Sequence, residues 1–403
     1  MAFPPRAQRW IILAVCALFQ AYTIGLIVYC FTLWIGPFMR EFGSERAPIV
    51  ALASVAGLIM ACSAPIAGWA TDRFPIRWVA GAGVLLFATG LLLLSQSSSL
   101  GQMWLIYSTL LPFGAALAGP VAAQTAVTRT FETRNGLALG ICWAGTALGG
   151  LILPPLTAAL IESVGWRMTH LYLSVFGLVL AAPVLLVLGR VRGIARTTTE
   201  SGGAIGPPPT FAAILRVRRF WMILLAVVPI SVVFASVQFN LGPLASDLHF
   251  EPRTTGYALS LLSASMIAAK LSFGALADRI DYRFLLWTCI GAMVSAVVAL
   301  SVGTRGAYLV SVVFLGAAGG GFLPLLGVMF HDYFRGVEFG RAIGLCFFAL
   351  NATYIGPWIA ARMRDLTGSY ILTLQLMLVL LLPASIVVSF LGRRHAVGAA
   401  RAV

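Results

Sequence analysis

The chain has 403 residues, of which 60% are hydrophobic and only 10% are charged. Soluble globular domains carry about a quarter charged residues, so this composition excludes an ordinary soluble protein. The net charge of +14 would suggest a nucleic-acid partner for a soluble domain, but here the arginines gather in short segments between apolar runs. We therefore expect an integral membrane protein that binds no nucleic acid.

Apolar runs long enough to cross a bilayer, about 20 residues each, recur along the whole chain. We predict twelve membrane spans, near residues 10–35, 49–70, 78–95, 103–127, 136–160, 168–189, 220–244, 255–276, 284–302, 306–328, 340–361 and 369–391. With the N-terminus inside the cell, most of the 27 basic residues fall on the cytoplasmic side, as the positive-inside rule requires. Both termini are then cytoplasmic, and the protein is predicted to be a multi-pass protein of the cell membrane.

Motifs for reactive chemistry are missing from the sequence. The six cysteines all fall within apolar runs, where they are expected to be packing residues rather than disulfides or metal ligands. No P-loop, CxxC or HExxH pattern is present. We expect no enzyme activity, cofactor or metal, and the longest loop is too short for the soluble module of a sensor.

The composition changes abruptly after the sixth predicted span. Residues 189–220 are rich in Gly, Pro, Ser and Thr and contain six arginines, which favours a cytoplasmic loop. The sequence thus predicts an N-terminal six-helix bundle over residues 1–189, an interdomain loop over 190–219 and a C-terminal six-helix bundle over 220–403.

The two predicted halves share a sequence repeat. "GWATDRFPIR" at 68–77 and "GALADRIDYR" at 274–283 both follow the pattern Gly-x-x-x-Asp-Arg-x-x-x-Arg. A weaker repeat relates "GAALAG" at 114–119 to "GAAGGG" at 316–321. Internal repeats of this kind are typical of secondary transporters.

This doubled loop resembles the major facilitator superfamily over essentially the whole chain. The resemblance implies an all-α fold of two pseudo-symmetric bundles, in which these loops form cytoplasmic latches. Glycine permits close helix approach, and a carboxylate can meet a helix N-terminus. The predicted latch residues are Gly68, Asp72, Arg73, Arg77, Gly274, Asp278, Arg279 and Arg283. The alternative is that the arginines only anchor the topology.

Residues 129–155 resemble the segment that leads into helix 5 of monocarboxylate transporters and oxalate–formate antiporters. The matching residues are Phe131, Arg134, Asn135, Leu137, Ala138, Gly140, Ala144, Gly145 and Gly149. The glycines themselves are expected to serve helix packing.

Lys270, the only lysine of the chain, lies within a predicted span. In the animal monocarboxylate transporters helix 8 carries an arginine for the substrate carboxylate, and the resemblance places Lys270 on that position. This chain departs from the pattern at Met266, where those transporters have a carboxylate, and at Leu33, where helix 1 of those transporters has a lysine.

A charge at this depth costs about 2.5–3.5 kcal/mol on insertion scales, and no acidic residue falls in the middle of a predicted span. We therefore expect the missing counter-ion to be an anionic substrate. The alternative is that the lysine extends to the membrane surface, toward the end of the helix near Asp278.

The resulting prediction is a secondary transporter of a small organic anion, most simply a monocarboxylate with an apolar or aromatic body, which works by alternating access. The predicted substrate-binding residues are Lys270, Tyr29, Gln124, Trp143, Thr146, Gln238, Asn240, Asn351 and Tyr354. For all but Lys270, hydrogen bonding between helices is an equal alternative. Proton symport, anion exchange and uniport stay open, as does a facilitator that exports drugs or neutral metabolites. We expect a monomer in the lipid bilayer.

Overall fold

The structure, a computed structural model, describes residues 6–44, 46–131, 134–191, 210–249, 252–334, 339–367 and 369–391. Every regular element in these ranges is helical. The elements of the first part of the chain are α1 (Arg6–Ile24), η1 (Gly25–Tyr29), α2 (Phe31–Phe42), α3 (Arg46–Arg73), α4 (Ile76–Ser95), α5 (Leu100–Leu117), α6 (Pro120–Thr130) and α7 (Asn135–Leu188). The later elements are α8 (Phe211–Leu215), α9 (Arg218–Asp247), α10 (Pro252–Ala277), α11 (Tyr282–Ser301), α12 (Arg305–Tyr333), α13 (Phe339–Ala352), η3 (Thr353–Ile355), α14 (Gly356–Thr367) and α15 (Ile371–Phe390).

Within the described ranges, 10 helices are long and apolar enough to cross a membrane. The protein is therefore an all-α, multi-pass membrane protein, as the sequence predicts. Helix α7 has 54 residues, about 80 Å of helix, which far exceeds the roughly 30 Å of a hydrocarbon core. Its backbone is non-helical only at Gly165 (φ 80°, ψ 165°), between the two spans predicted for this region. Twelve crossings and the cytoplasmic placement of the termini stay predictions.

Three predicted spans are broken helices. The run at 10–35 consists of α1, a π-helical turn over Gly25–Tyr29 and then α2. The run at 103–127 is interrupted before Pro120, which cannot donate a backbone hydrogen bond and becomes the first residue of α6. The run at 340–361 is divided by the short 3₁₀ segment η3. Irregular backbone at membrane depth is tolerated where it lies inside the protein or beside a cavity.

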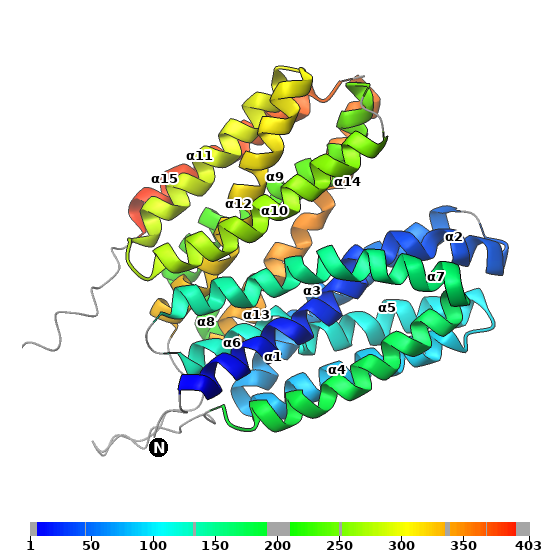
Figure 1. Cartoon of the computed structure of the whole chain (residues 1–403). Coiled ribbons are helices and arrows are strands. Elements are labelled where there is room, and N and C mark those ends of the chain that lie inside the picture. Colours follow the sequence, from blue (N-terminus) through cyan, green and yellow to red (C-terminus); the bar gives the residue numbers. More distant parts are fainter. Residues whose placement is uncertain are drawn as a thin grey trace, which may run out of the picture.

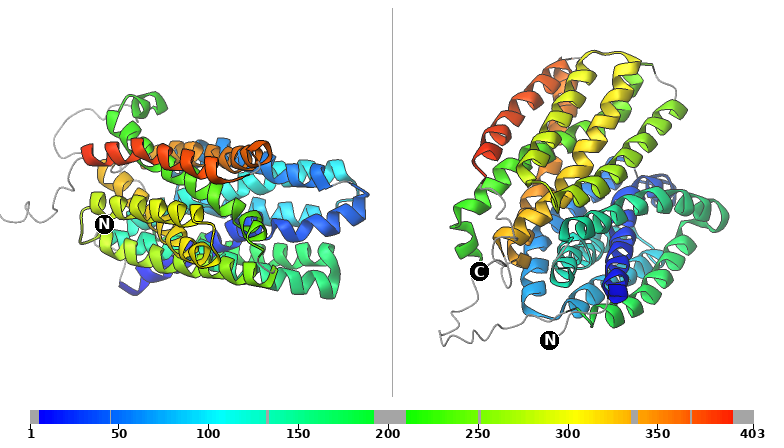
Figure 2. Two further views of the ribbon diagram at one scale, coloured as in Figure 1. Left: turned by 90° about the horizontal axis from the view of Figure 1, so that it is seen from above. Right: turned by 60° about the vertical axis from the view of Figure 1, so that its left-hand side comes forward.

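The helices form two groups, one containing α1–α7 and the other α9–α12, α14 and α15, with α13 packed along α3 (Figure 1). The two groups lie together at the end that carries α6 and α8, and their ribbons diverge toward the end that carries α2 (Figure 1). The right-hand view of Figure 2 shows the same grouping. This grouping agrees with the predicted division at 1–189, 190–219 and 220–403, which stays a prediction because residues 192–209 lie outside the described ranges.

Candidate functional site

Two closely packed helix pairs join the groups. In the first pair, α3 with α13, a methyl group added to Gly68 would collide with the backbone of Gly340, and one added to Gly344 would collide with the carbonyl oxygen of Ala64. Only glycine lets the two backbones approach this closely. The contact therefore depends on small residues on both helices.

The second pair, α7 with α10, repeats this arrangement with the halves exchanged. A methyl group on Gly136 would meet the backbone of Gly274, and one on Gly140 would meet the carbonyl oxygen of Lys270. Ala64 and Lys270 are separated by the same 206 residues as Gly68 and Gly274 in the repeated motif. Lys270 thus occupies, in the second half, the place that a methyl side chain occupies in the first.

Both repeated aspartates meet the N-terminus of a helix in the opposite half. Asp72 accepts hydrogen bonds from the backbone N–H groups of Gly340 (3.0 Å) and Arg341 (2.8 Å), at the start of α13. Asp278 accepts from Gly136 (2.7 Å) and Leu137 (3.0 Å), at the start of α7. A carboxylate is stabilised there by unpaired N–H groups and by the helix dipole. Each carboxylate thus joins the two halves.

The arginines of the repeated loops have local partners. Arg73 lies over the ring of Trp69, and Arg77 lies over the ring of Trp78, at 5.7 and 5.0 Å from the ring centres. Arg283 pairs with Asp281 of its own half at 3.1 Å.

The side chain of Arg279 is exposed. Another arginine, Arg129 of α6, lies 3.4 Å from Asp72. Sequence reasoning missed this residue because it lies outside the repeated motif.

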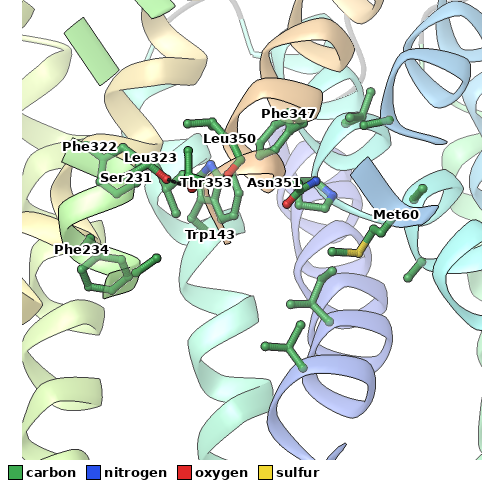
Figure 3. Close-up of a pocket in the computed structure, with 18 of the residues that line it drawn as sticks. Met60, Trp143, Ser231, Phe234, Phe322, Leu323, Phe347, Leu350, Asn351 and Thr353 are labelled. Carbon is green, nitrogen blue, oxygen red and sulfur yellow. Dashed lines mark hydrogen bonds between the residues drawn. The ribbon is translucent and has the colours of Figure 1, made fainter. Parts of the chain in front are cut away.

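A cavity of about 150 Å³ lies between the two helix groups and is lined by residues of both (Figure 3). Its wall is mostly apolar and comes from α1, η1, α3, α5, α6, α7, α9, α12, α13 and η3. The lining residues are Ile24, Val28, Met60, Ala64, Ala115, Ala116, Pro120, Val121, Trp143, Ser231, Phe234, Ala235, Gln238, Phe322, Leu323, Phe347, Leu350, Asn351 and Thr353. All three helix breaks, at η1, before α6 and at η3, contribute residues to this wall, which gives them a role in shaping the cavity.

Lys270 is buried next to the cavity, with 1% of its surface exposed. Its Nζ donates hydrogen bonds to the carbonyl oxygen of Trp143 (3.1 Å) and to Oγ1 of Thr146 (2.9 Å), both on α7. An ammonium has three N–H donors, and both of these acceptors are neutral. Among the described residues no carboxylate forms an ion pair with it. The nitrogen does not extend to the membrane surface in this structure, and its charge is not balanced by the protein around it.

Trp143 connects the lysine to the cavity. Trp143 is part of the cavity lining. Lys270 donates a hydrogen bond to the main-chain carbonyl oxygen of Trp143 but is not itself part of the lining. The indole Nε1 is buried and has no hydrogen-bond partner among the described residues. The ring packs 5.9 Å from the ring of Phe347 on α13, so the two halves also meet at this level.

The structure places four of the other predicted binding residues in three kinds of position. Gln238 and Asn351 line the cavity with Trp143. Thr146 is buried and holds Lys270. Gln124 is fully buried outside the lining, close to Gly327 of α12, and neither of its amide atoms has a partner in the described part of the chain.

Asn240 and Tyr29 make contacts with other helices of the protein and lie outside the cavity lining. Asn240 donates to the carbonyl oxygens of Ser236 and Pro357 and accepts from the hydroxyl of Tyr370. The ring of Tyr29 packs against Gly150 of α7, outside the cavity lining. The side chain of Tyr354 lies outside the described residues.

Sequence reasoning missed the aromatic residues that form much of the wall. Phe234, Phe322 and Phe347 line the cavity, and nothing in a sequence with 25 phenylalanines marks the first two. A sign was available for Phe347, because it follows Gly340 and Gly344 as Trp143 follows Gly136 and Gly140.

Comparison with known proteins places this geometry in context. The family model described as Major Facilitator Superfamily matches residues 11–302 and 230–402. Human monocarboxylate transporter 12 is 24% identical, over 91% of this chain and 77% of its own length. Bovine monocarboxylate transporter 13 is 23% identical, over 92% and 86%, and human monocarboxylate transporter 2 is 25% identical, over 91% and 82%.

Among solved structures, the human organic anion transporter MFSD10 (TETRAN) is similar in fold. Its TM-score is 0.69 at 17% sequence identity, and the match covers 96% of this chain and 100% of that one.

Proposed function

The chain belongs to the Major Facilitator Superfamily, and from this premise we propose that it carries a small organic anion, a monocarboxylate, across the membrane by alternating access. Because the family consists of transporters, the chain is a transporter and not an enzyme. The substrate, the coupling and the individual roles of the residues belong to the proposal.

The observation that carries this proposal is the environment of Lys270. Its ammonium is buried and meets two neutral oxygens on α7, although a buried charge is stable only when it is paired or fully hydrogen-bonded. A substrate carboxylate would supply the missing negative charge and an acceptor for the third N–H group. The similarity to monocarboxylate transporters supports the same class of substrate.

The lining of the cavity limits the rest of the substrate. Phe234, Phe322 and Phe347 provide an apolar, aromatic wall, and Gln238 and Asn351 add neutral amides. None of the described residues that line the cavity is cationic, and Lys270 lies beside the lining as a single positive charge. This disfavours a dicarboxylate. We therefore propose a monocarboxylate with an apolar or aromatic body.

For the mechanism, we propose that the two halves rock about this cavity. The contacts of Asp72 and Asp278 with helix N-termini would stabilise the state that is closed at their end, the predicted cytoplasmic end. Gly68, Gly274 and the loop arginines would act in the same latch. Release of the substrate to the cytoplasm would require Asp72 to leave the N-terminus of α13 and Asp278 to leave the N-terminus of α7.

For coupling, we propose proton symport or anion exchange. Lys270 would retain its proton while the anion is bound and could release it when the site is empty. The expected coupling ion for symport is then the proton. We also propose that the protein works as a monomer.

Uptake into proteoliposomes tests the proposal. The purified protein is given radiolabelled phenylacetate, lactate and pyruvate, and a neutral amide of the same size as a control. We expect saturable uptake of at least one acid, and loss of that uptake in Lys270→Gln, which keeps hydrogen-bonding capacity but removes the charge. Transport of only neutral or cationic compounds would favour the exporter alternative.

A further inference from the structure

Trp143 stands between the cavity and the only lysine of the chain. Its indole is part of the cavity wall, and its main-chain carbonyl oxygen accepts the hydrogen bond from Nζ of Lys270. Nζ lies 5.9 Å from the centre of the indole ring, and Lys270 itself is absent from the lining. A molecule in the cavity therefore meets the indole before it can meet the ammonium.

The indole carries a donor that the described protein does not use. Nε1 is buried without a hydrogen-bond partner in the described ranges, and an indole N–H can only donate. Leaving a buried donor unpaired costs free energy, so buried tryptophans usually find an acceptor. Because Trp143 belongs to the cavity wall, a ligand that reached this N–H group would supply the missing acceptor, and the neighbouring ammonium would favour a ligand with negative charge.

The opposite half offers no equivalent group. The residue that corresponds to Trp143 in the second glycine-packed helix is Phe347, and the residue that corresponds to Lys270 is Ala64. Both line the cavity, and neither side chain has a polar atom. Figure 3 shows Trp143 with Phe347 and Asn351 in the same region of the wall. The donor and the charge thus occur together on one side only.

We propose that Trp143 is the entrance residue of the anion site: its indole N–H receives the substrate carboxylate, and its ring separates Lys270 from the cavity until the anion has bound. This inference rests on the proposed transport of a monocarboxylate. It adds a specificity-determining contact, because a carboxylate gains more from an N–H donor beside an ammonium than a neutral acceptor does, and a cationic molecule is repelled by the ammonium.

Two substitutions separate the two roles of the side chain. Trp143→Phe keeps an aromatic ring over Lys270 but removes the N–H group, whereas Trp143→Ala removes both. Trp34→Phe is the matched control, because Trp34 is a buried tryptophan outside the cavity lining.

The first measurement is calorimetric binding of phenylacetate to the full chain in detergent. Trp143→Phe should raise the Kd at least about ten-fold, the loss expected for one hydrogen bond to a charged group, and Trp34→Phe should leave it unchanged. An unchanged Kd in Trp143→Phe, with normal binding by the native protein, overturns this inference alone. Absence of phenylacetate binding by the native protein overturns both this inference and the proposed aromatic monocarboxylate.

The second measurement uses the single lysine as a reporter. A small N-hydroxysuccinimidyl acetate reagent can acylate only Lys270 and the N-terminal amine, which serves as the internal reference. Peptide mass spectrometry should find Lys270 protected in the native protein and in Trp143→Phe, but acylated several-fold faster in Trp143→Ala. Equal rates in all three proteins would show that the ring does not cover the lysine.

Discussion

Replacing Asp278 by Asn should weaken the closure of the two halves at the end where the repeated loops lie. The carboxylate accepts 2.7 and 3.0 Å hydrogen bonds from two backbone N–H groups of α7. Asparagine retains one acceptor oxygen but turns an NH₂ group toward the second N–H and removes the charge that favours the helix dipole. One hydrogen bond to a charged group is worth about 2 kcal/mol net, so the ratio of open to closed protein should rise about 30-fold.

Spin labels can measure this change as a distance between the halves. Trp78 and Phe284 are exposed and occupy corresponding positions, two residues after the start of α4 and of α11. Cysteines at these two sites, in a protein with the exposed Cys62 replaced by serine, would carry the labels. Pulsed electron resonance should then show a longer distance component in Asp278→Asn.

The matched control for this experiment lies three residues away. Asp281→Asn makes the same change of charge, but Asp281 contacts Arg283 of its own half. It should change the distance distribution much less than Asp278→Asn does, because the contact of Asp281 with Arg283 stays within one half. If both variants match the native distribution, or both broaden it equally, the contact of Asp278 with α7 does not control closure.

Three further predictions concern packing, the buried amide and coupling. Gly140→Ala should also lengthen the distance between the spin-labelled halves, because the added methyl group meets the backbone of Lys270 and overpacking costs about 1–3 kcal/mol. Gly57→Ala is the control, because Gly57 lies in open space. Equal distance distributions in the two variants would argue against this packing role. Gln124→Leu should raise the free energy of unfolding by about 1 kcal/mol, since both amide atoms are buried and have no hydrogen-bond partner among the described residues. A lower thermal midpoint of the variant in detergent would mean that the amide has a favourable partner. If Lys270 couples protons, the uptake rate should rise when the external pH is lowered. Lys270→Arg should lose this pH dependence while retaining exchange. An uptake rate of the native protein that does not change with pH would refute the coupling.

The helices were predictable because a bilayer imposes a simple rule on length and hydropathy. The predicted runs at 49–70 and 220–244 correspond to α3 and α9. The interruptions were harder to predict, because the π-helical turn over Gly25–Tyr29 and the 3₁₀ segment at Thr353–Ile355 depend on tertiary packing. The break before Pro120 was visible in principle, since proline at this depth removes a helical hydrogen bond.

The candidate site was predictable only where a side chain carries the signal. The repeated Asp72 and Asp278 could be identified from the sequence. Their partners could not, because they are backbone N–H groups, which almost every residue type carries. The same holds for the carbonyl oxygen of Trp143 that holds Lys270. The correspondence of Trp143 with Phe347 could be found only from the glycines that precede each residue, because the two are 204 residues apart, whereas the repeated loops are 206 apart.

The most direct test of the central claim is a comparison of a charged and an uncharged ligand of one shape. Phenylacetate and phenylacetamide are titrated calorimetrically into the native protein and into Lys270→Gln. We predict that the native protein prefers the acid by at least about ten-fold, and that this preference disappears in the variant through loss of affinity for the acid. Equal affinity for the two compounds in the native protein, or an intact preference for the acid in Lys270→Gln, would contradict the assignment of Lys270 as the charge that selects the substrate.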